Sequence, residues 1–433
     1  MTAREAALRT LIACEKQGAW ADAFLKKTLR DSGMDGRDAA LATRLTFGVV
    51  QNRILLDWYI DRFARGKLDL PVRCALRLGA YQMLFLDRIP ASAAVNESVK
   101  LTRKFCKNPA APGLVNAVLR NLGRNMEQLT PPEELSVRFS HPQWLVDAFV
   151  QRLGQDGARA LLACHNGEVP TMAQVNTCRA DTKRVLDELL ANGTQAQPHP
   201  WLPDCLTLQG TGDLEQLDAF QKGEVYIQDA AARLAVLAAQ PKPGMRVLDV
   251  CAAPGGKSFA SAVAMENRGE IISCDIHPHK QALIENGARR LGLDIVRAVT
   301  QDGTKRVPDW EGGFDLVIAD VPCSGLGIIR KKPDIRYKDP EPLAGLPAVQ
   351  SAILENVCSY VKPGGVLLYS TCTLLERENE AVVSRFVGAH DEFSLEKFEL
   401  PCPNGAAEGG HITLWPHIHG TDGFFIAKLR RRT

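Results

Sequence analysis

The sequence predicts three successive regions: an all-helical N-terminal domain, a small α+β module, and an α/β domain built on a doubly wound, Rossmann-like parallel sheet. Two observations lead to this prediction. In the first third, apolar residues recur every three to four positions, whereas in the last part short β-rich runs alternate with helical stretches. The chain has 433 residues, enough for two or three domains. We expect boundaries at 1–130, 131–224 and 225–433.

The first region has a helical period throughout. Apolar residues follow three-and-four spacing within 6–12, 41–55 and 76–84. Glycine and proline residues separate these segments, and no alternating strand pattern of any length occurs before residue 126. An all-helical domain is therefore expected.

The same region is basic. Residues 1–140 hold 22 Lys and Arg against 14 Asp and Glu, while the remainder holds 30 against 36. A basic domain favours a polyanionic partner such as RNA, although an ordinary solvated surface has the same composition.

The second region begins after a linker pattern at 129–134, which includes two consecutive prolines. Helical stretches at 144–153 and 182–191 alternate with extended ones at 171–177 and 205–208. We expect a small α+β module there, without a motif that carries chemistry.

The third region alternates strands and helices. Four β-rich runs lie at 247–250, 271–275, 315–320 and 366–370, and each ends in a polar residue or a turn. This pattern is typical of a doubly wound parallel sheet, which binds ligands beyond the carboxyl ends of its strands. A last strand is expected near 423–428.

A glycine turn follows the first of these strands, at 249–258, and opens a helix. Such a turn brings backbone N–H groups close to a ligand. A phosphate-binding loop needs glycine where this chain has Cys251, and the dinucleotide pattern GxGxxG is absent. Asp275 closes the second strand and Asp302 follows the third, as in S-adenosylmethionine sites. A glycine turn without a ligand is the alternative.

Two cysteines stand apart because each follows a strand of the same sheet: Cys323 in Asp-Val-Pro-Cys-Ser and Cys372 in Ser-Thr-Cys-Thr. A thiolate that adds to carbon 6 of cytosine makes carbon 5 nucleophilic enough to accept a methyl group. Asp320 is placed to hydrogen-bond the base near N3. With no CxxC pair in the chain, we expect nine other cysteines to be small buried residues: Cys14, Cys74, Cys106, Cys164, Cys178, Cys205, Cys274, Cys358 and Cys402.

The glycine turn at 250–257 and the two cysteine motifs at 320–324 and 370–372 resemble those of the NOL1/NOP2/Sun RNA 5-methylcytosine methyltransferases. The resemblance implies that Cys372 forms a covalent adduct with cytosine and that Cys323 assists release of the product. Val321 stands where the commoner family form has alanine. The resemblance also implies an S-adenosylmethionine site lined by Cys251, Ala252, Ala253, Pro254, Gly255, Gly256, Lys257, Asp275, Asp302 and Asp320.

The helical region, at 79–84, 89–99 and 113–120, resembles the NusB-like RNA-binding domain. Family members that combine this domain with the methyltransferase act on cytosine 967 of 16S rRNA, so the resemblance implies that substrate. It covers nearly the whole chain and is strongest at 76–120 and 225–375.

Three cations that follow Cys323, namely Arg330, Lys331 and Lys332, are expected to contact phosphates beside the target base. Three histidines near Trp415 lack a metal-ligand pattern, so we expect no metal. The absence of an apolar signal segment and of a membrane-length apolar run predicts a cytoplasmic protein, which we expect to be monomeric. The alternatives are a methyltransferase for another RNA, a non-catalytic RNA-binding adaptor and a nucleotide hydrolase.

Overall fold

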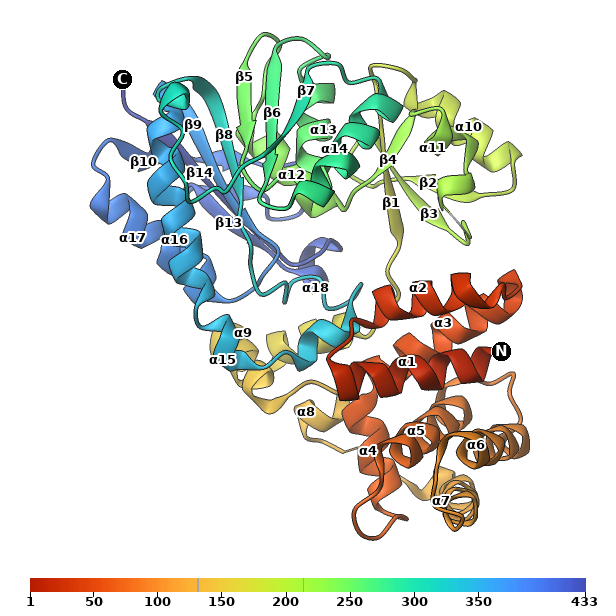
Figure 1. The fold of residues 1–433 in the computed structure, drawn as a ribbon. Helices are drawn as coiled ribbons and strands as arrows, with labels where there is room; N and C mark the ends of the chain where they lie inside the picture. The colour runs from red at the N-terminus through yellow and green to blue at the C-terminus, as the bar shows by residue number, and fades with distance from the viewer. Residues whose placement is uncertain (131, 213) are drawn as a thin grey trace. The chain divides into compact units, whose positions relative to one another are not determined.

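The structure, a computed structural model, describes residues 1–130, 132–212 and 214–433 (Figure 1). Pro131, in the expected linker at 129–134, and Asp213 lie outside the described residues. The chain forms two units. Unit 1 comprises residues 1–167 together with 331–338, and unit 2 comprises 168–330 and 339–433.

Unit 1 is helical, as the apolar period predicts. Its main core contains Leu8, Leu45, Leu56 and Leu76, and a smaller cluster forms around Leu25. Gly79 allows two helices to approach closely, since a Cβ there would lie 2.4 Å from Leu119. The helices are α1 (Ala3–Gln17), α2 (Ala21–Ser32), α3 (Gly36–Gln51), α4 (Arg53–Asp61), α5 (Leu70–Phe85), α6 (Ala91–Phe105), α7 (Ala111–Asn125), η1 (Met126–Gln128), α8 (Leu135–Arg138), α9 (Gln143–His165) and η4 (Pro333–Tyr337).

Residues 331–338 place a buried cation inside this unit. The side chain of Arg336 is fully buried, and burial lowers its pKa to about 10. Its guanidinium donates to the side-chain oxygen of Asn166 at 2.9 Å and to the carbonyl of Gln51 at 3.1 Å. It also donates to the carbonyls of Ser140 and His165, at 3.3 and 3.5 Å. One side chain therefore satisfies acceptors from several separate parts of unit 1.

We predict that Arg336→Met destabilises unit 1. Each buried acceptor left without its donor costs about 1–3 kcal/mol, so the free energy of unfolding should fall by about 3 kcal/mol or more. Urea unfolding followed by far-UV circular dichroism measures this loss. Lys332→Met, on the exposed part of the same segment, is the control and should change little. Equal unfolding midpoints for the two variants would contradict the prediction.

Unit 2 begins with the expected α+β module. Four antiparallel strands pair in the order β2-β3-β1-β4, and helix α10 packs its Val185 and Leu189 against Val175 and Leu206 of the sheet. The elements are β1 (Thr171–Val175), α10 (Thr182–Ala191), β2 (Gln195–Pro198), β3 (Cys205–Gln209), η2 (Leu214–Gln216), α11 (Asp218–Gln221) and β4 (Val225–Ile227).

The large sheet of unit 2 has the order β10-β14-β9-β8-β5-β6-β7, and β13 pairs with β14. The five strands β5 to β9 are parallel, whereas β14, the expected last strand, runs antiparallel to β9. The expected doubly wound sheet is thereby confirmed. Its elements are α12 (Ala230–Ala239), β5 (Arg246–Asp249), α13 (Gly256–Ala264), β6 (Glu270–Asp275), α14 (Pro278–Leu291), β7 (Val296–Thr300), η3 (Pro308–Trp310), β8 (Phe314–Asp320), α15 (Pro340–Leu343), α16 (Leu346–Val357), η5 (Cys358–Tyr360), β9 (Val361–Thr371), η6 (Glu376–Glu378), α17 (Glu380–Ala389), β10 (Phe393–Leu395), β11 (Phe398–Glu399), β12 (Ala406–Ala407), β13 (His411–Leu414), α18 (Pro416–His419) and β14 (Phe424–Arg431).

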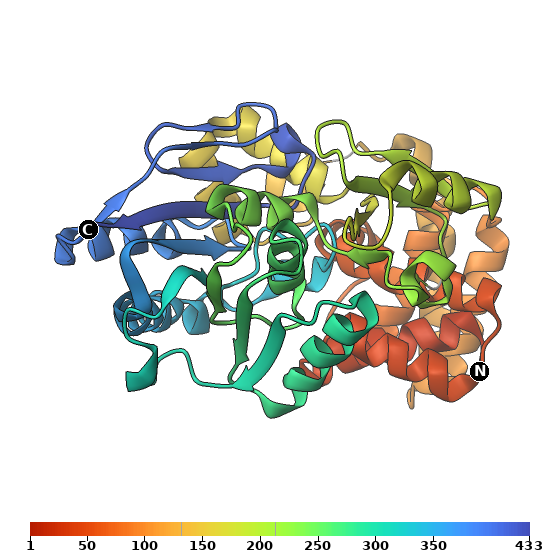
Figure 2. The same cartoon turned by 90° about the horizontal axis from the view of Figure 1, so that it is seen from above.

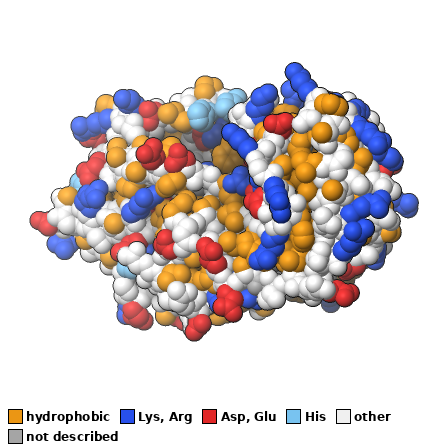
Figure 3. Space-filling view, turned by 90° about the horizontal axis from the view of Figure 1, so that it is seen from below, with side chains coloured by type: hydrophobic (Ala, Val, Ile, Leu, Met, Phe, Trp, Pro, Cys, Tyr) orange, Lys and Arg blue, Asp and Glu red, His pale blue; other side chains and the backbone are white. Residues whose placement is uncertain are grey.

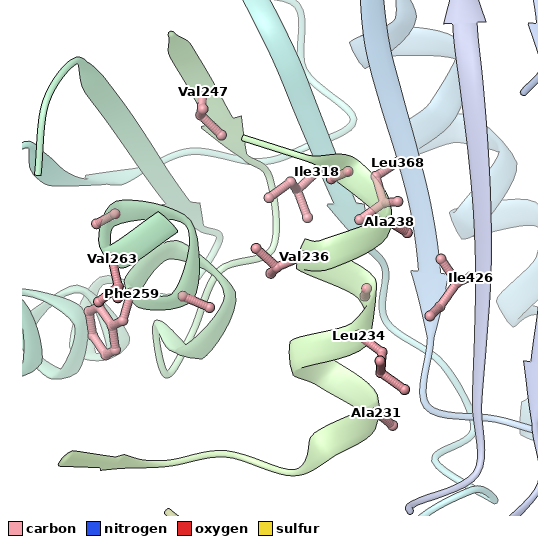
Figure 4. Close-up of a cluster of buried hydrophobic side chains, with 14 of the residues drawn as sticks. Ala231, Leu234, Val236, Ala238, Val247, Phe259, Val263, Ile318, Leu368 and Ile426 are labelled. Atoms are coloured by element: carbon pink, nitrogen blue, oxygen red, sulfur yellow. The ribbon is translucent and has the colours of Figure 1, made fainter. Parts of the chain in front are cut away.

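Helices cover both faces of this sheet (Figures 1 and 2). Successive strand residues point to opposite faces, so Leu368 belongs to the core that includes α12, α13 and α14, whereas Leu367 belongs to the core on the other face, which includes α16 and α17. Figure 4 shows Leu234 and Ala238 of α12 on the side of the helix that faces Leu368 and Ile426. Both faces are apolar, which is why the strands read as nearly continuous hydrophobic runs.

A series of buried, hydrogen-bonded polar side chains lies next to the glycine turn. Ser273 on β6 donates to the hydroxyl of Ser258, and Ser258 donates to the carboxylate of Asp249, both at 2.7 Å. Burial raises the pKa of Asp249 from its ordinary value of 3.8 to about 7, although the Ser258 hydrogen bond and the charge of Lys257 partly oppose this shift. Ionised Asp249 therefore destabilises the folded chain relative to the protonated form.

We predict that Asp249→Asn becomes more stabilising, relative to the wild type, as pH rises from about 4 to about 7. The unfolded chain loses the Asp249 proton near pH 4, whereas the folded chain holds it up to about pH 7, so the stability of the wild type falls across this range. The difference of about three pKa units between the folded and unfolded chains corresponds to at most about 4 kcal/mol. Unfolding titrations of both proteins at several pH values measure the difference.

Asp315→Asn is the control for this prediction. Burial raises the pKa of Asp315, but hydrogen bonds from the Arg246 amide and Lys362 outweigh burial and lower it. The Asp315→Asn variant should therefore lose stability relative to the wild type as pH rises. A parallel pH trend for the two variants would refute the assignment.

Candidate active site

The carboxyl ends of the five parallel strands meet at one edge of the large sheet. Asp249, Asp275 and Asp320 close β5, β6 and β8, while Asp302 lies two residues after β7 and Cys372 directly follows β9. The chain leaves β5 toward β6 and β7 and later returns to the other side of β5 as β8. This reversal of strand order between β5 and β8 marks the place where such sheets bind ligands.

The glycine turn is held at this edge by backbone hydrogen bonds. The amide of Val250 donates to Ile318 at 2.9 Å, and that of Ala252 donates to Cys274 at 2.7 Å. Gly255 has φ of +112°, and a Cβ there would lie 2.3 Å from the ring of Phe259. Glycine is thus required where the turn opens α13, whose first N–H groups face the edge.

Lys257, which is buried, and Asp320, which is half-buried, form an ion pair at the centre of the site. The Lys257 ammonium lies 2.6 Å from one carboxylate oxygen of Asp320, and the Ser370 hydroxyl donates to the other at 2.7 Å. Lys257 is 8% exposed and its nitrogen lies 4.9 Å from the ring centre of Phe424. Sequence reasoning assigned both residues to the cofactor site without predicting that they pair.

The two predicted thiols lie together. The sulfur atoms of Cys323 and Cys372 are 3.2 Å apart, and both side chains are half-buried. The hydrogen bond to Cys372, together with burial, raises the pKa of Cys323 well above its ordinary range. Cys323 is therefore a neutral thiol at physiological pH, and its proton is available to the sulfur of Cys372.

A second set of polar side chains holds the Cys323 loop. The hydroxyls of Ser324 and Thr373 are 2.6 Å apart and connect the loops that bear the two thiols. The buried carboxylate of Glu378 accepts from the Ser324 amide at 2.9 Å and from Gln350 on α16 at 3.0 Å. The Gln350 amide also donates to the carbonyl of Pro322 at 3.0 Å.

Asn379 holds the residues on either side of Cys372. It accepts from the hydroxyl of Thr371 at 2.6 Å and donates to the carbonyl of Thr373 at 3.0 Å. Neither Asn379 nor Glu378 was singled out from the sequence. The available signal is the polar run at 376–380 directly after the Cys372 motif, two of whose members are fully buried.

The backbone of Gly327 hydrogen-bonds to two other backbone segments, those of Cys372 and Gly423. Its amide donates to the carbonyl of Cys372 at 2.9 Å, and its carbonyl accepts from the amide of Gly423 at 2.8 Å. A Cβ on Gly327 would lie 1.9 Å from the Gly423 carbonyl. Only glycine fits this close approach.

Asp275 and Asp302 lie at the ends of neighbouring strands, as the cofactor hypothesis requires. Asp275 accepts from the amide of His277 at 2.9 Å, and Lys280 lies 3.3 Å away. Asp302 accepts from the amide and the hydroxyl of Thr304, and these bonds lower its pKa. Two fixed carboxylates beside a glycine turn are a suitable acceptor set for the hydroxyls of a ribose.

The remaining site residues are placed as follows. Cys251, in the glycine turn, is half-buried, and burial raises its pKa. Arg330 donates to the carbonyls of Gly420 and Thr421, both at 3.3 Å, and the exposed Lys331 and Lys332 open the segment that belongs to unit 1. Their expected contact with phosphates stays a prediction.

The expectation that nine cysteines are buried is wrong for Cys178, which is exposed because it lies in the turn after β1. Cys74, Cys205, Cys274 and Cys358 are buried, and the other four are half-buried. Within the described ranges, no group of three or more His, Cys, Asp or Glu side chains is arranged to hold a metal ion. In the same residues, no helix combines the length and the apolar character needed to cross a membrane.

Three family models match the chain. The model described as 16S rRNA methyltransferase RsmB/F matches residues 236–430, and the NusB family model matches 1–124. A model for the ferredoxin-like domain of RsmF/B-like methyltransferases matches 141–215. The three matches fall on the three regions that the sequence pattern predicts.

Solved structures share the fold. The crystal structure of PH0851 has a TM-score of 0.82 and 26% identity, and the match covers 99% of both chains. The structure of NSun6 from Pyrococcus horikoshii with SFG has a TM-score of 0.60 and 23% identity, and covers 67% of this chain and 98% of that one.

Curated relatives match over nearly their full length. The probable ribosomal RNA small subunit methyltransferase B of Bacillus subtilis is 36% identical, with 99% of this chain and 98% of the relative covered. The probable enzyme of that name from Synechocystis is 34% identical over the whole of both chains, and the enzyme from Erwinia tasmaniensis is 32% identical over 91% and 90%. The expected resemblance is confirmed, and the protein belongs to the ribosomal RNA small subunit methyltransferase B family.

Proposed function

We propose that the protein methylates carbon 5 of a cytosine in 16S rRNA, cytosine 967, with S-adenosylmethionine as the methyl donor. The observation that carries this proposal is the pair of sulfur atoms 3.2 Å apart, on loops that follow the strands bearing Asp320 and its hydrogen-bond partner Ser370. The names of the full-length relatives support an rRNA of the small subunit as the substrate. Such a substrate implies that the enzyme works in the cytoplasm.

Cys372 is the proposed nucleophile. When the Cys372 thiol gives up its proton to a base, the Cys323 thiol, whose own pKa is raised well above its ordinary range, donates a hydrogen bond to the resulting thiolate. The thiolate adds to carbon 6 of the cytosine, and carbon 5 then carries the electron pair that accepts the methyl group. The base must be unstacked to reach this position.

Asp320 is the proposed contact for the base. Its carboxylate is oriented by Lys257 on one oxygen and by Ser370 on the other. Asp320 is proposed to share a proton with N3 of the cytosine, so that protonation of N3 neutralises the negative charge that develops on the ring when the thiolate adds. The ammonium of Lys257 compensates the charge of the half-buried carboxylate and helps to keep it in this orientation.

Cys323 is proposed to assist release of the product. After methyl transfer, the carbon 5 proton leaves to a base and the bond between carbon 6 and the Cys372 sulfur breaks. The sulfur departs as a thiolate, and the Cys323 thiol stabilises it by the same hydrogen bond that stabilised the nucleophile. One neutral thiol thus acts at both ends of the reaction.

S-adenosylmethionine, when bound, supplies the methyl group. The residues proposed to hold it are the glycine turn at 251–257, Asp275 and Asp302, with Asp320 beside its reactive end. Their backbone N–H groups and carboxylates suit the amino acid and ribose parts of that molecule.

We propose that the regions 1–130, 131–224 and 225–433 are separate functional domains. The first region is proposed to bind RNA through its basic surface, and the third to hold the cofactor and the cytosine. Arg330, Lys331 and Lys332 are proposed to contact phosphates near the target base, and one chain is expected to suffice for activity.

The test of this function uses 16S rRNA from a strain that lacks the gene. Incubation with the protein and labelled S-adenosylmethionine should transfer methyl groups, and bisulfite sequencing should locate 5-methylcytosine at position 967. A different methylated position would overturn the site assignment. Cofactor binding without transfer to any RNA would overturn the activity, and absence of cofactor binding by calorimetry would favour an RNA-binding adaptor.

We predict opposite effects for the two thiols. Cys372→Ala should lower methyl transfer by at least about a thousandfold and form no covalent RNA adduct, because the nucleophile is lost. Cys323→Ala should slow turnover yet accumulate the adduct, because release is impaired. Denaturing gels with labelled rRNA detect the adduct. Cys178→Ala, an exposed cysteine outside the site, is the control. The roles are wrong if Cys372→Ala accumulates adduct or if Cys323→Ala releases product at the wild-type rate.

A further inference from the structure

Gln228 connects strand β4 of the α+β module to helix α12 of the large-sheet domain. Its backbone is held on both sides by strand β1. The Gln228 amide donates to the carbonyl of Met172 at 3.2 Å, and the Gln228 carbonyl accepts from the side chain of Gln174 at 3.1 Å. Gln174 is itself buried, with 2% of its surface exposed. The module therefore fixes the position of Gln228 within unit 2.

The side chain of Gln228 is buried, yet its carboxamide has no hydrogen-bond partner among the residues that the structure describes. The residue is 8% exposed, and the Oε1 atom is buried without a donor. No hydrogen bond of the Nε2 atom occurs in the same residues. Most buried polar groups in folded proteins are hydrogen-bonded, because an unpaired one costs free energy. An unpaired carboxamide at this depth therefore indicates a partner that does not belong to the chain.

The carboxamide lies against the first residue of helix α13. A Cβ added to Gly256 would lie 3.0 Å from the Nε2 atom of Gln228 and 3.6 Å from its Cδ atom. In the described ranges, the amides of Gly256 and Lys257 have no acceptor either. A helix N-terminus also carries partial positive charge. Three donors at this helix end are a suitable site for an anion, and a carboxylate has two oxygen atoms to share among them.

Two lysines beside the proposed cofactor residues are already paired. The ammonium of Lys257 lies 2.6 Å from Asp320, and that of Lys280 lies 3.3 Å from Asp275. A carboxylate bound at the start of α13 would therefore be held by neutral donors. The glycine turn is the part of the proposed site that takes the amino acid portion of S-adenosylmethionine, and this portion carries one carboxylate.

We propose that the Nε2 atom of Gln228 donates to the carboxylate of bound S-adenosylmethionine, and that the α+β module completes the cofactor site by holding this residue. This role rests on the proposed function for the identity of the cofactor. The module, whose sequence carries no motif for chemistry, thus contributes one binding residue. In the complex, the carboxamide gains the hydrogen bond that it lacks in the chain alone.

Isothermal titration calorimetry of the full chain without RNA measures cofactor affinity apart from methyl transfer. The two ligands are S-adenosylmethionine and its decarboxylated form, which lacks the proposed acceptor. Figure 3 shows charged side chains of both signs on one face of the molecule, so all titrations use one salt concentration. We expect Gln228→Met, which keeps the length of the side chain, to raise Kd for S-adenosylmethionine about tenfold. Kd for the decarboxylated ligand should change by less than about twofold.

Gln228→Glu replaces the donor by a carboxylate of the same shape. It should raise Kd for S-adenosylmethionine more than Gln228→Met does, because two carboxylates then repel each other, and it should not weaken binding of the decarboxylated ligand. The matched control is Gln197→Met, at an exposed glutamine of the same module. This control should bind both ligands within about twofold of the wild type, because its side chain lies at the surface.

Melting temperatures separate a binding role from a structural one. Gln228→Met removes an unpaired buried group, so without ligand it should melt no lower than the wild type, and S-adenosylmethionine should raise its melting temperature less. The inference is overturned if Gln228→Met binds S-adenosylmethionine as tightly as the wild type does, or loses equal affinity for both ligands. A wild-type chain that binds no S-adenosylmethionine would refute the cofactor and this role together. Gln228-dependent binding without methyl transfer to rRNA would leave this role standing and refute the proposed function.

Discussion

The pairing of β8 with β9 determines the geometry of the site. Because the strands are parallel and Asp320 is opposite Ser370, the residues that follow both strands leave the sheet at the same edge. Cys323 and Cys372 come three and two residues later, so their sulfur atoms meet. Lys257 reaches Asp320 from the neighbouring glycine turn. A shift of this register by one residue would direct Ser370 to the opposite face and separate the groups.

The site also limits negative charge in a region of low dielectric. Burial raises the pKa of Asp249 to about 7, Asp320 is paired with Lys257, and Cys323 is held as a neutral thiol. The negative charge of these three groups is therefore limited in different ways: by partial protonation at Asp249, by an ion pair at Asp320 and by retention of the proton at Cys323. In the proposed mechanism the thiolate of Cys372 receives a hydrogen bond from the neutral Cys323 thiol.

The sequence was sufficient for the elements that depend on local patterns. Helical apolar spacing, β-rich runs and the glycine turn predicted the fold class. The positions of Cys323 and Cys372 after neighbouring strands predicted that the two thiols lie at the same sheet edge, and their sulfur atoms are 3.2 Å apart. The burial of long polar side chains was not predictable in this way. From the sequence alone Glu378 would be expected at the surface, but its carboxylate accepts hydrogen bonds from Gln350 and Ser324. Arg336 donates to Asn166, which is 170 residues away in the sequence. Such partners are set by tertiary structure alone.

The path of the chain has a consequence for modularity. Residues 331–338 leave unit 2, complete the interior of unit 1 through Arg336, and return. A gene fission after residue 167 would therefore separate the helices from a side chain that fills their interior, and a transplanted helical unit would require three junctions instead of one. The helical unit therefore depends on a segment that the chain supplies only after β8, which restricts how recombination can exchange it.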